Sequence, residues 1–101
     1  MRSLPLLALL CCSSPSADEV KDEFDRYVAD RADCTTADDC TVVAADCPLG
    51  CWVAVRADRT GEVEEKAEEL VDDYESGGAR CDYECAAAPA VACTASVCTL
   101  E

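Results

Sequence analysis

Ten of the 101 residues are cysteine, and this limits the fold more than any other feature of the sequence. Two cysteines lie in an apolar stretch near the N-terminus, and eight follow it: Cys34, Cys40, Cys47, Cys51, Cys81, Cys85, Cys93 and Cys98. An even number of cysteines in a short chain is typical of a disulfide framework formed in an oxidising compartment. We therefore predict four disulfides among these eight residues, and their spacing leaves the pairing open.

Cross-links are needed because the sequence offers little for a hydrophobic core. It has one Trp, one Phe and three Tyr, so Val, Leu and Ala must supply most of the buried area. A single domain of this size buries only roughly 60–65% of the surface of its unfolded chain. Each disulfide typically adds ~2–4 kcal/mol to the free energy of unfolding, mainly by restricting the unfolded chain.

The first 17 residues have the pattern of a secretory leader. Arg2 is followed by an apolar run over residues 4–12 and then by small residues up to Ala17. The run is too short to span a bilayer, which needs about 20 apolar residues. We therefore predict a leader over residues 1–17 and a single acidic domain over residues 18–101.

Two ways of processing this leader remain open. Cleavage near Ser16 or Ala17 would release a secreted chain, whereas acylation of Cys11 or Cys12 would give a lipoprotein with a Ser-rich tether. Ser16 and Glu19 match a capping box at the start of a helix, and cleavage after Ser16 would remove that cap. In both cases we expect the protein outside the cytoplasm, either secreted or in the cell envelope.

Hydrophobic periodicity predicts two helices and several short strands. Apolar residues recur at helical spacing over residues 18–33 and 61–76, and two glycines follow the second stretch. Short apolar or alternating runs predict strands at 41–45, 52–55, 81–85, 91–93 and 97–100. A two-residue turn at 95–96 would place Cys93 opposite Cys98, where the two could bridge.

The order of these elements predicts the fold class. Helix, two strands, helix and then two or three strands indicate an α+β domain. We expect two helices covering an antiparallel sheet of four to five short strands, in the order α-β-β-α-β-β.

Charge and composition exclude several functions. Twenty-two Asp and Glu against eight Lys and Arg give a formal net charge of −14, which repels nucleic acid and anionic lipid. Membrane contact is therefore expected only through an N-terminal lipid anchor. The chain has no His, the usual general base for a Ser or Cys nucleophile. We predict a protein that is not an enzyme and that holds no cofactor or metal.

The pairs Cys47/Cys51 and Cys81/Cys85 share a spacing that occurs in other settings. Helical-hairpin scaffolds carry twin Cys-x3-Cys motifs on helices, but a Pro and a Gly inside the first pair exclude a helix there. A zinc site would accept the spacing, yet no His assists and the setting is extracellular. Thiol redox chemistry needs a reactive Cys-x-x-Cys, which is missing. Structural disulfides are the interpretation that we keep.

The second predicted helix carries a dense acidic face that is a candidate binding surface. It lacks the loop and central Gly of a calcium-binding hand. Its candidate binding residues are Glu62, Glu65, Glu69 and Asp72, and Glu68 and Asp73 lie on the same face. A solvated helix face is the alternative interpretation. Trp52 is the only large aromatic of the first predicted hairpin and a candidate anchor, since Trp is over-represented at binding hot spots. Packing on a neighbouring disulfide or sheet face is the alternative interpretation for Trp52.

The chain from Cys34 onward also carries a resemblance. With its segments DCPLGC and VAV and the four later cysteines, it resembles small cysteine-rich proteins of predicted bacterial secretomes, over about two thirds of the chain. The resemblance implies export and disulfides. No activity is established for that group, so it implies no function.

Two hypotheses for the function follow. The first is an exported, non-catalytic binding module of the bacterial cell envelope or extracellular space, whose unknown partner is a protein surface or other ligand with basic character. The second is a small inhibitor of a secreted hydrolase, in which the loop Cys47–Cys51 presents Leu49 to the enzyme's cleft. A rigid, cross-linked loop suits such an inhibitor because it loses little conformational freedom on binding.

Overall fold

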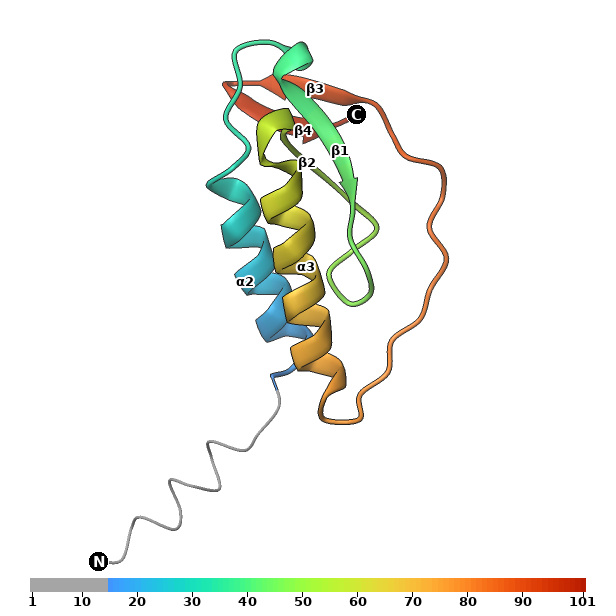
Figure 1. The fold of residues 1–101 in the computed structure, drawn as a ribbon. Coiled ribbons are helices and arrows are strands. Elements are labelled where there is room, and N and C mark those ends of the chain that lie inside the picture. The colour runs from blue at the N-terminus through green and yellow to red at the C-terminus, as the bar shows by residue number, and fades with distance from the viewer. Residues whose placement is uncertain (1–14) are drawn as a thin grey trace, which may run out of the picture.

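The computed structural model describes residues 15–101, and it is an α+β domain (Figure 1). The leader over residues 1–14, with Cys11 and Cys12, lies outside the described residues. The elements follow the predicted order: α2 (Ala17–Ala29), β1 (Cys40–Ala44), β2 (Trp52–Arg56), α3 (Thr60–Glu75), β3 (Val91–Thr94) and β4 (Val97–Leu100), with short 3-10 turns at Ala37–Asp39 and Ala57–Arg59. No helix among these residues is long and apolar enough to cross a membrane.

Helix α2 begins where its capping residues place it. The Ser16 hydroxyl accepts the Glu19 backbone N–H at 3.1 Å, and the Glu19 carboxylate accepts the Ser16 backbone N–H at 2.7 Å. This capping box satisfies two backbone donors that would otherwise lack a partner. Ser16 is therefore the N-cap of the first helix in the described residues.

The same helix ends earlier than its periodicity predicts, at Ala29 instead of residue 33. The backbone that follows bonds to other elements. The Arg31 carbonyl accepts from the Arg56 N–H at 2.8 Å, and the Ala32 carbonyl accepts from the Cys98 N–H at 2.7 Å. These bonds hold residues 31–34 between β2 and β4, and they replace a further turn of helix.

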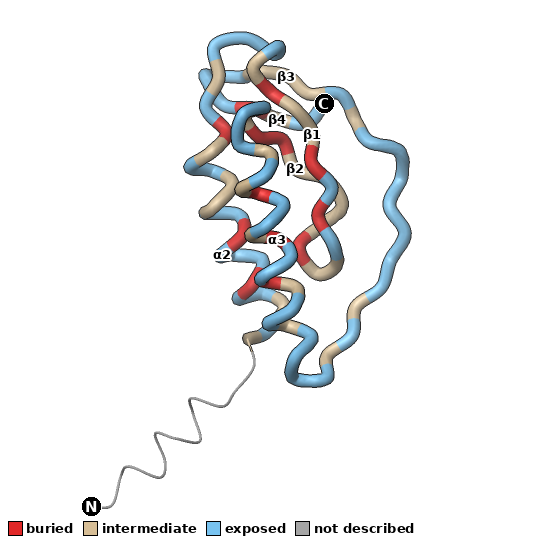
Figure 2. Tube along the Cα trace, viewed as in Figure 1, coloured by how far each residue is buried: buried red, intermediate tan, exposed pale blue. Residues whose placement is uncertain are grey.

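Strands β1 and β2 form a hairpin with a helix-covered face and an opposite face. They pair antiparallel, with Val43 opposite Val53 and Thr41 opposite Val55. Val43 and Val55 are buried in the main core together with Val20, Phe24, Leu49, Val63 and Leu70. Figure 2 shows these buried positions concentrated between the helices and the hairpin. The amphipathic stripe of α3 and the alternation of the strands thus meet in one core.

Strands β3 and β4 form a second, separate hairpin, so the four strands make two two-stranded sheets and not one. Ala95 and Ser96 both have positive φ, 53° and 67°, as a two-residue hairpin turn requires. A small cluster made of Ala32, Cys40, Ala54 and Cys98 lies between the hairpins. Two disulfides and the backbone hydrogen bonds to Ala32 and Cys34 fasten the second hairpin to the rest of the domain.

Residues 79–90 form an extended outer segment, and the predicted strand at 81–85 is wrong. The segment leaves the end of α3, where Gly78 adopts a left-handed φ of 89°, and runs along the outside of the domain to β3 (Figure 1). Disulfides from Cys81 and Cys85 tie it to the loop between β1 and β2. Covalent links thus take the place of a hydrogen-bonded ladder.

Candidate binding surface

All eight cysteines of the described domain are paired, which confirms the predicted cysteine-rich, disulfide-bonded character. The pairs are Cys34–Cys93, Cys40–Cys98, Cys47–Cys81 and Cys51–Cys85. Cys93 and Cys98 do lie opposite each other in the second hairpin, but each bonds to a cysteine from the first half of the domain and not to the other. Both hairpin strands are thereby fastened to the rest of the fold.

Two of these disulfides bring sulfur atoms together in the interior. The Sγ atoms of Cys34, Cys40 and Cys98 lie within 4.8 Å of one another. Each belongs to a disulfide, however, and metal binding requires the free thiolate. The cluster is therefore a packed pair of cross-links in this structure.

Leu49 is buried, and this corrects its assignment as a binding residue. Its side chain is 1% exposed and belongs to the main core. The loop turns inward at this point because Leu49 is its only large aliphatic side chain, and burying it removes apolar surface from water. A residue so placed is not available to enter an enzyme's cleft.

Trp52 lies on the face of the first hairpin that points away from the helices. Its indole N–H donates to the Ala86 carbonyl at 3.0 Å, and its side chain is half-buried. The hydrogen bond holds the outer segment beside Cys51 and Cys85, which form a disulfide next to it. Trp52 is thus part of the attachment of the outer segment.

Glu62 is engaged in ion pairs and is not a free member of the acidic face. Its Oε1 accepts from Arg31 Nε at 2.9 Å, and its Oε2 accepts from an Arg59 guanidinium nitrogen at 2.8 Å. The hydrogen bond from Arg31, with that from Arg59, holds the pKa of Glu62 below its ordinary value. This carboxylate ties the end of α2 to the start of α3.

Glu69 is also partly neutralised, because Lys66 lies beside it. Lys66 Nζ is 2.8 Å from a Glu23 oxygen and 3.5 Å from a Glu69 oxygen, and it lies 5.5 Å from the centre of the Tyr27 ring. The hydrogen bond to Glu23 raises the pKa of Lys66. Of the four predicted acidic residues, Glu65 and Asp72 are exposed and form no ion pair within residues 15–101.

A denser acidic surface lies on the side of α3 that faces the first hairpin and the outer segment. It contains two hollows, which we call the acidic hollows and which share Asp46. The first has a volume of about 340 Å³ and is lined by Ala44, Asp46, Glu64, Ala67 and Glu68. The second has a volume of about 330 Å³ and is lined by Asp46, Cys47, Val71, Glu75, Cys81, Asp82 and Tyr83.

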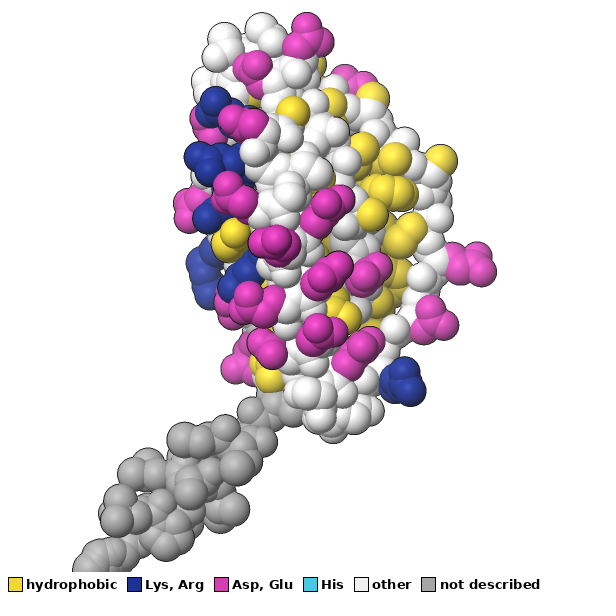
Figure 3. All heavy atoms as spheres, viewed as in Figure 1, with side chains coloured by type: hydrophobic (Ala, Val, Ile, Leu, Met, Phe, Trp, Pro, Cys, Tyr) yellow, Lys and Arg dark blue, Asp and Glu magenta, His cyan; other side chains and the backbone are white. Residues whose placement is uncertain are grey.

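The carboxylates of the acidic hollows are unneutralised. None of the described residues that line either hollow is Lys or Arg, and none of these carboxylates forms an ion pair within the described part of the chain. Figure 3 shows Asp and Glu side chains gathered over α3, with most of the visible Lys and Arg along the α2 side and one basic side chain at the outer segment. It also shows hydrophobic side chains between the acidic ones and the outer segment.

Sequence reasoning missed most of this surface. Of its carboxylates, only Glu68 belonged to the predicted acidic face, and Glu64 was missed although it lies one helical turn before Glu68 in the sequence. Asp46 and Asp82 had no such signal, because they lie in a loop and in the outer segment. Disulfide Cys47–Cys81 brings these two loops together, and its pairing was not readable from the spacing.

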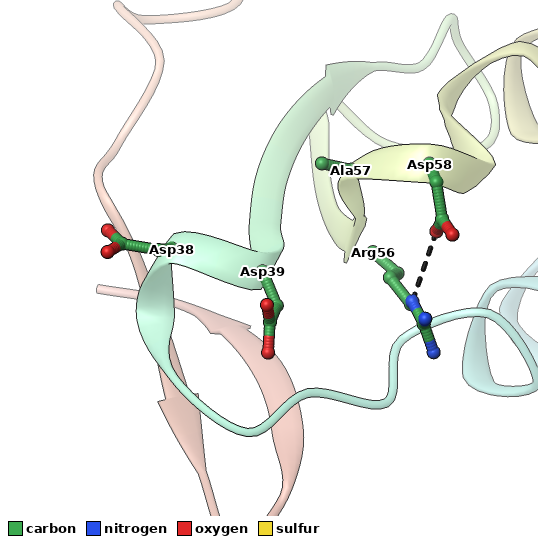
Figure 4. A pocket seen from close by; sticks show the side chains of 5 residues that line it. All are labelled: Asp38, Asp39, Arg56, Ala57 and Asp58. Carbon is green, nitrogen blue, oxygen red and sulfur yellow. Dashed lines mark ion pairs between the residues drawn. The ribbon is translucent and has the colours of Figure 1, made fainter.

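A third hollow, of 220 Å³, is lined by Asp38, Asp39, Arg56, Ala57 and Asp58 (Figure 4). Apart from Asp38, its charged side chains already have partners. Arg56 pairs with Asp58 at 3.1 Å and with Asp33 at 2.7 Å. Hydrogen bonds from the backbone N–H groups of Thr35 and Thr36 hold the pKa of Asp39 low. Asp38 points away from Arg56 in Figure 4. This hollow is therefore a less favourable binding site than the acidic hollows.

Comparison with known proteins adds no relative. No protein-family model matches the chain, and no curated protein and no solved structure matches it. The function must therefore be argued from the surface itself.

Proposed function

We propose that this protein is an exported, non-catalytic binding module of the bacterial cell envelope or extracellular space, and that it captures a basic protein segment at the acidic hollows. One observation carries the proposal: five carboxylates surround two adjoining hollows without a cation among the residues that line them, and they are Asp46, Glu64, Glu68, Glu75 and Asp82. Glu62 on the same helix, by contrast, forms ion pairs with two arginines.

The carboxylates around the hollows repel one another, and a cationic partner would reduce this repulsion. Glu64 and Glu68 are one turn apart on α3, where like charges destabilise a helix by roughly 0.2–0.5 kcal/mol per pair. Asp46 faces them from the loop after β1. A Lys or Arg side chain placed among the three would replace repulsion by attraction. Val71 and Tyr83 offer the second hollow an apolar wall for the methylene stem of such a side chain.

Export is part of the proposal and rests on the disulfides and on the leader pattern. Structural disulfides persist in oxidising compartments and are rare in the cytosol of mesophiles. Ser16 caps α2, so a chain processed ahead of residue 16 keeps this cap. Acylation at Cys11 or Cys12 retains it, whereas cleavage at Ser16 or Ala17 removes it.

We therefore expect the chain recovered from the producing cell to begin ahead of Ser16, with all eight domain cysteines oxidised. Intact-mass spectrometry before and after reduction and alkylation measures the mature N-terminus, any acyl chain and the thiol count together. A mature chain that begins at Asp18, or free thiols in native material, would contradict this expectation.

The binding proposal is tested with a short, end-blocked peptide of alternating Lys and Thr. We expect it to bind the oxidised protein, and we expect binding to weaken between low salt and about 0.15 M salt, where charges more than ~8 Å apart are screened. The matched peptide of alternating Glu and Thr should not bind. Isothermal titration calorimetry at the two salt concentrations measures both.

The matched protein variants locate the surface. Glu64→Gln/Glu68→Gln should weaken binding roughly threefold to tenfold, since an exposed ion pair contributes ~0.2–1 kcal/mol. Glu65→Gln/Asp73→Asn removes the same charge from the same helix outside the hollows and should change binding by about twofold at most. Equal effects of the two variants would refute a site at the acidic hollows.

A further inference from the structure

One edge of the first hairpin has unpaired backbone groups. Strands β1 and β2 pair Val42 with Ala54 and Ala44 with Trp52, and the next pair along is joined by a bond from the Ala45 N–H to the Cys51 carbonyl at 3.0 Å. Hydrogen-bonded and non-bonded pairs alternate in an antiparallel ladder. The N–H and C=O groups of Val42 and Ala44 therefore point away from β2.

A second hydrogen bond supports this assignment of bonded and non-bonded pairs. Arg56 belongs to the same set of non-bonded pairs, and its N–H points away from β1 to the Arg31 carbonyl. The outer edge of β2 therefore already has a hydrogen-bond partner at Arg56. Within residues 15–101, no backbone or side-chain hydrogen bond outside the β1–β2 ladder involves Val42 or Ala44. Ala44 is exposed and Val42 is half-buried. The edge of β1 therefore presents two donors and two acceptors.

This edge adjoins the first acidic hollow. Ala44 of β1 lines that hollow together with Glu64, Ala67 and Glu68 of α3 and with Asp46. A strand added along β1 would lie beside α3. Every second side chain of the added strand would be on the face that Val43 and Ala45 share with the helices, toward Glu64 and Glu68.

We infer that the basic partner binds as an extended strand added antiparallel to the free edge of β1, with alternate Lys or Arg side chains directed to the carboxylates of the first hollow. The inference rests on the proposed function and specifies how the partner is held. Main-chain hydrogen bonds give such strand addition its affinity, and the pockets for alternate side chains give it specificity. A second copy of this chain does not suit the edge, because each copy carries a net charge of −14.

Residue order in the test peptide follows from the geometry. Residues directly opposite each other in a ladder place their side chains on the same face. Peptide residues that bond to Val42 and Ala44 therefore point their side chains away from the helices, because Val42 and Ala44 share the face of Cys40 and Ala54. In the alternating Lys-Thr peptide, with Lys directed to α3, the Thr amides bond to β1 and the Lys amides face solvent.

Two N-methylated forms of that peptide test the inference on the unmodified protein. N-methylation of the Thr residues removes the donors aimed at β1, and we expect binding to weaken at least tenfold. N-methylation of the Lys residues blocks only the solvent-facing edge, so binding should stay within about threefold of the parent peptide. Titration calorimetry gives both constants, and amide chemical shifts should move most at Val42 and Ala44.

A matched pair of protein variants tests the same edge from the other side. Ala44→Pro removes an outward-pointing N–H, at a position where an edge strand tolerates proline, and should weaken the parent peptide at least tenfold. Ala44→Thr changes the side chain at the same position but keeps the N–H, and it should weaken the parent peptide much less than Ala44→Pro does. The far-ultraviolet circular dichroism of Ala44→Pro establishes whether its fold is retained, and the peptide pair gives the answer if it is not.

The outcomes separate the two proposals. Binding that depends on Glu64 and Glu68 but weakens equally with both methylated peptides, or with neither, overturns strand addition and leaves the proposed function standing. A parent peptide that does not bind overturns both. Dimerisation of the chain alone in sedimentation, abolished by Ala44→Pro, would make a second copy the occupant and would also overturn the inference.

Discussion

Reduction of the four disulfides is expected to unfold this protein at 25 °C. Two of the loops they close span 59 and 58 residues, for which restriction of the unfolded chain is worth roughly 4 kcal/mol each. The other two span 34 residues and contribute somewhat less. Even at ~2–4 kcal/mol for each bond, the sum reaches the whole net stability of ~5–15 kcal/mol that small domains have.

The core cannot compensate for this loss. Its buried side chains are mostly Val, Leu and Ala, with Phe24 as the only fully buried aromatic residue of the described domain. Titration with a reductant, followed by far-ultraviolet circular dichroism and by alkylation with mass counting, measures the transition. The circular dichroism signal of the fold should disappear over the same range of reductant concentration in which all eight cysteines become alkylated.

Two engineered forms serve as controls for the reduction experiment. Cys40→Ala/Cys98→Ala removes a buried bond that fastens the second hairpin, whereas Cys51→Ala/Cys85→Ala removes one at the exposed outer segment. The first should lower the free energy of unfolding more, because it also removes two sulfur atoms from the small cluster between the hairpins. A fully reduced, fully alkylated protein that keeps its circular dichroism spectrum would refute the dependence on disulfides.

The substitution Phe24→Ala is expected to cost about 3–5 kcal/mol of the free energy of unfolding, with all disulfides intact. The Phe24 side chain is 0% exposed and packs in the core between α2 and the first hairpin. The smaller side chain loses the burial of the ring and leaves a cavity that Val and Leu neighbours cannot fill without moving. Urea unfolding, monitored by circular dichroism, measures the loss.

A second aromatic residue provides the control for this substitution. Tyr83 is 45% exposed on the outer segment, so Tyr83→Ala should change the free energy of unfolding by about 0.5 kcal/mol or less. The same variant removes part of the wall of the second acidic hollow, and it should therefore affect peptide binding more than stability. Similar losses of stability for Phe24→Ala and Tyr83→Ala would show that the core does not lie where the structure places it.

Local patterns in the sequence predicted the elements well. Helices form where apolar residues recur every three or four positions, and the Ser16–Glu19 capping box is present at the start of α2. The turn at Ala95–Ser96 also forms, and it sets Cys93 opposite Cys98. These features depend on residues a few positions apart, so they can be predicted from the sequence.

The predictions that failed depended on contacts between distant residues. Leu49 had the signature of a loop tip, but the core between α3 and the hairpin buries it. Residues 81–85 alternate like a strand, yet they find no partner strand and are held by sulfur bonds to the first hairpin. Glu62 was predicted to lie on a free acidic face, but in the folded protein it accepts hydrogen bonds from Arg31 and Arg59.

The sequence by itself predicted a small, acidic, cross-linked α+β chain. The evidence was the number and spacing of the cysteines, the helical and strand periodicities and the excess of carboxylates, each of which depends on composition or on near neighbours. The sequence alone did not determine three other features. These are the pairing of cysteines 34 to 59 positions apart, the division of the strands into two hairpins, and the meeting of Asp46, Glu64 and Asp82 around the acidic hollows. They depend on how the chain packs in three dimensions, since a carboxylate acquires a role only from the charges and backbone groups that folding brings to it.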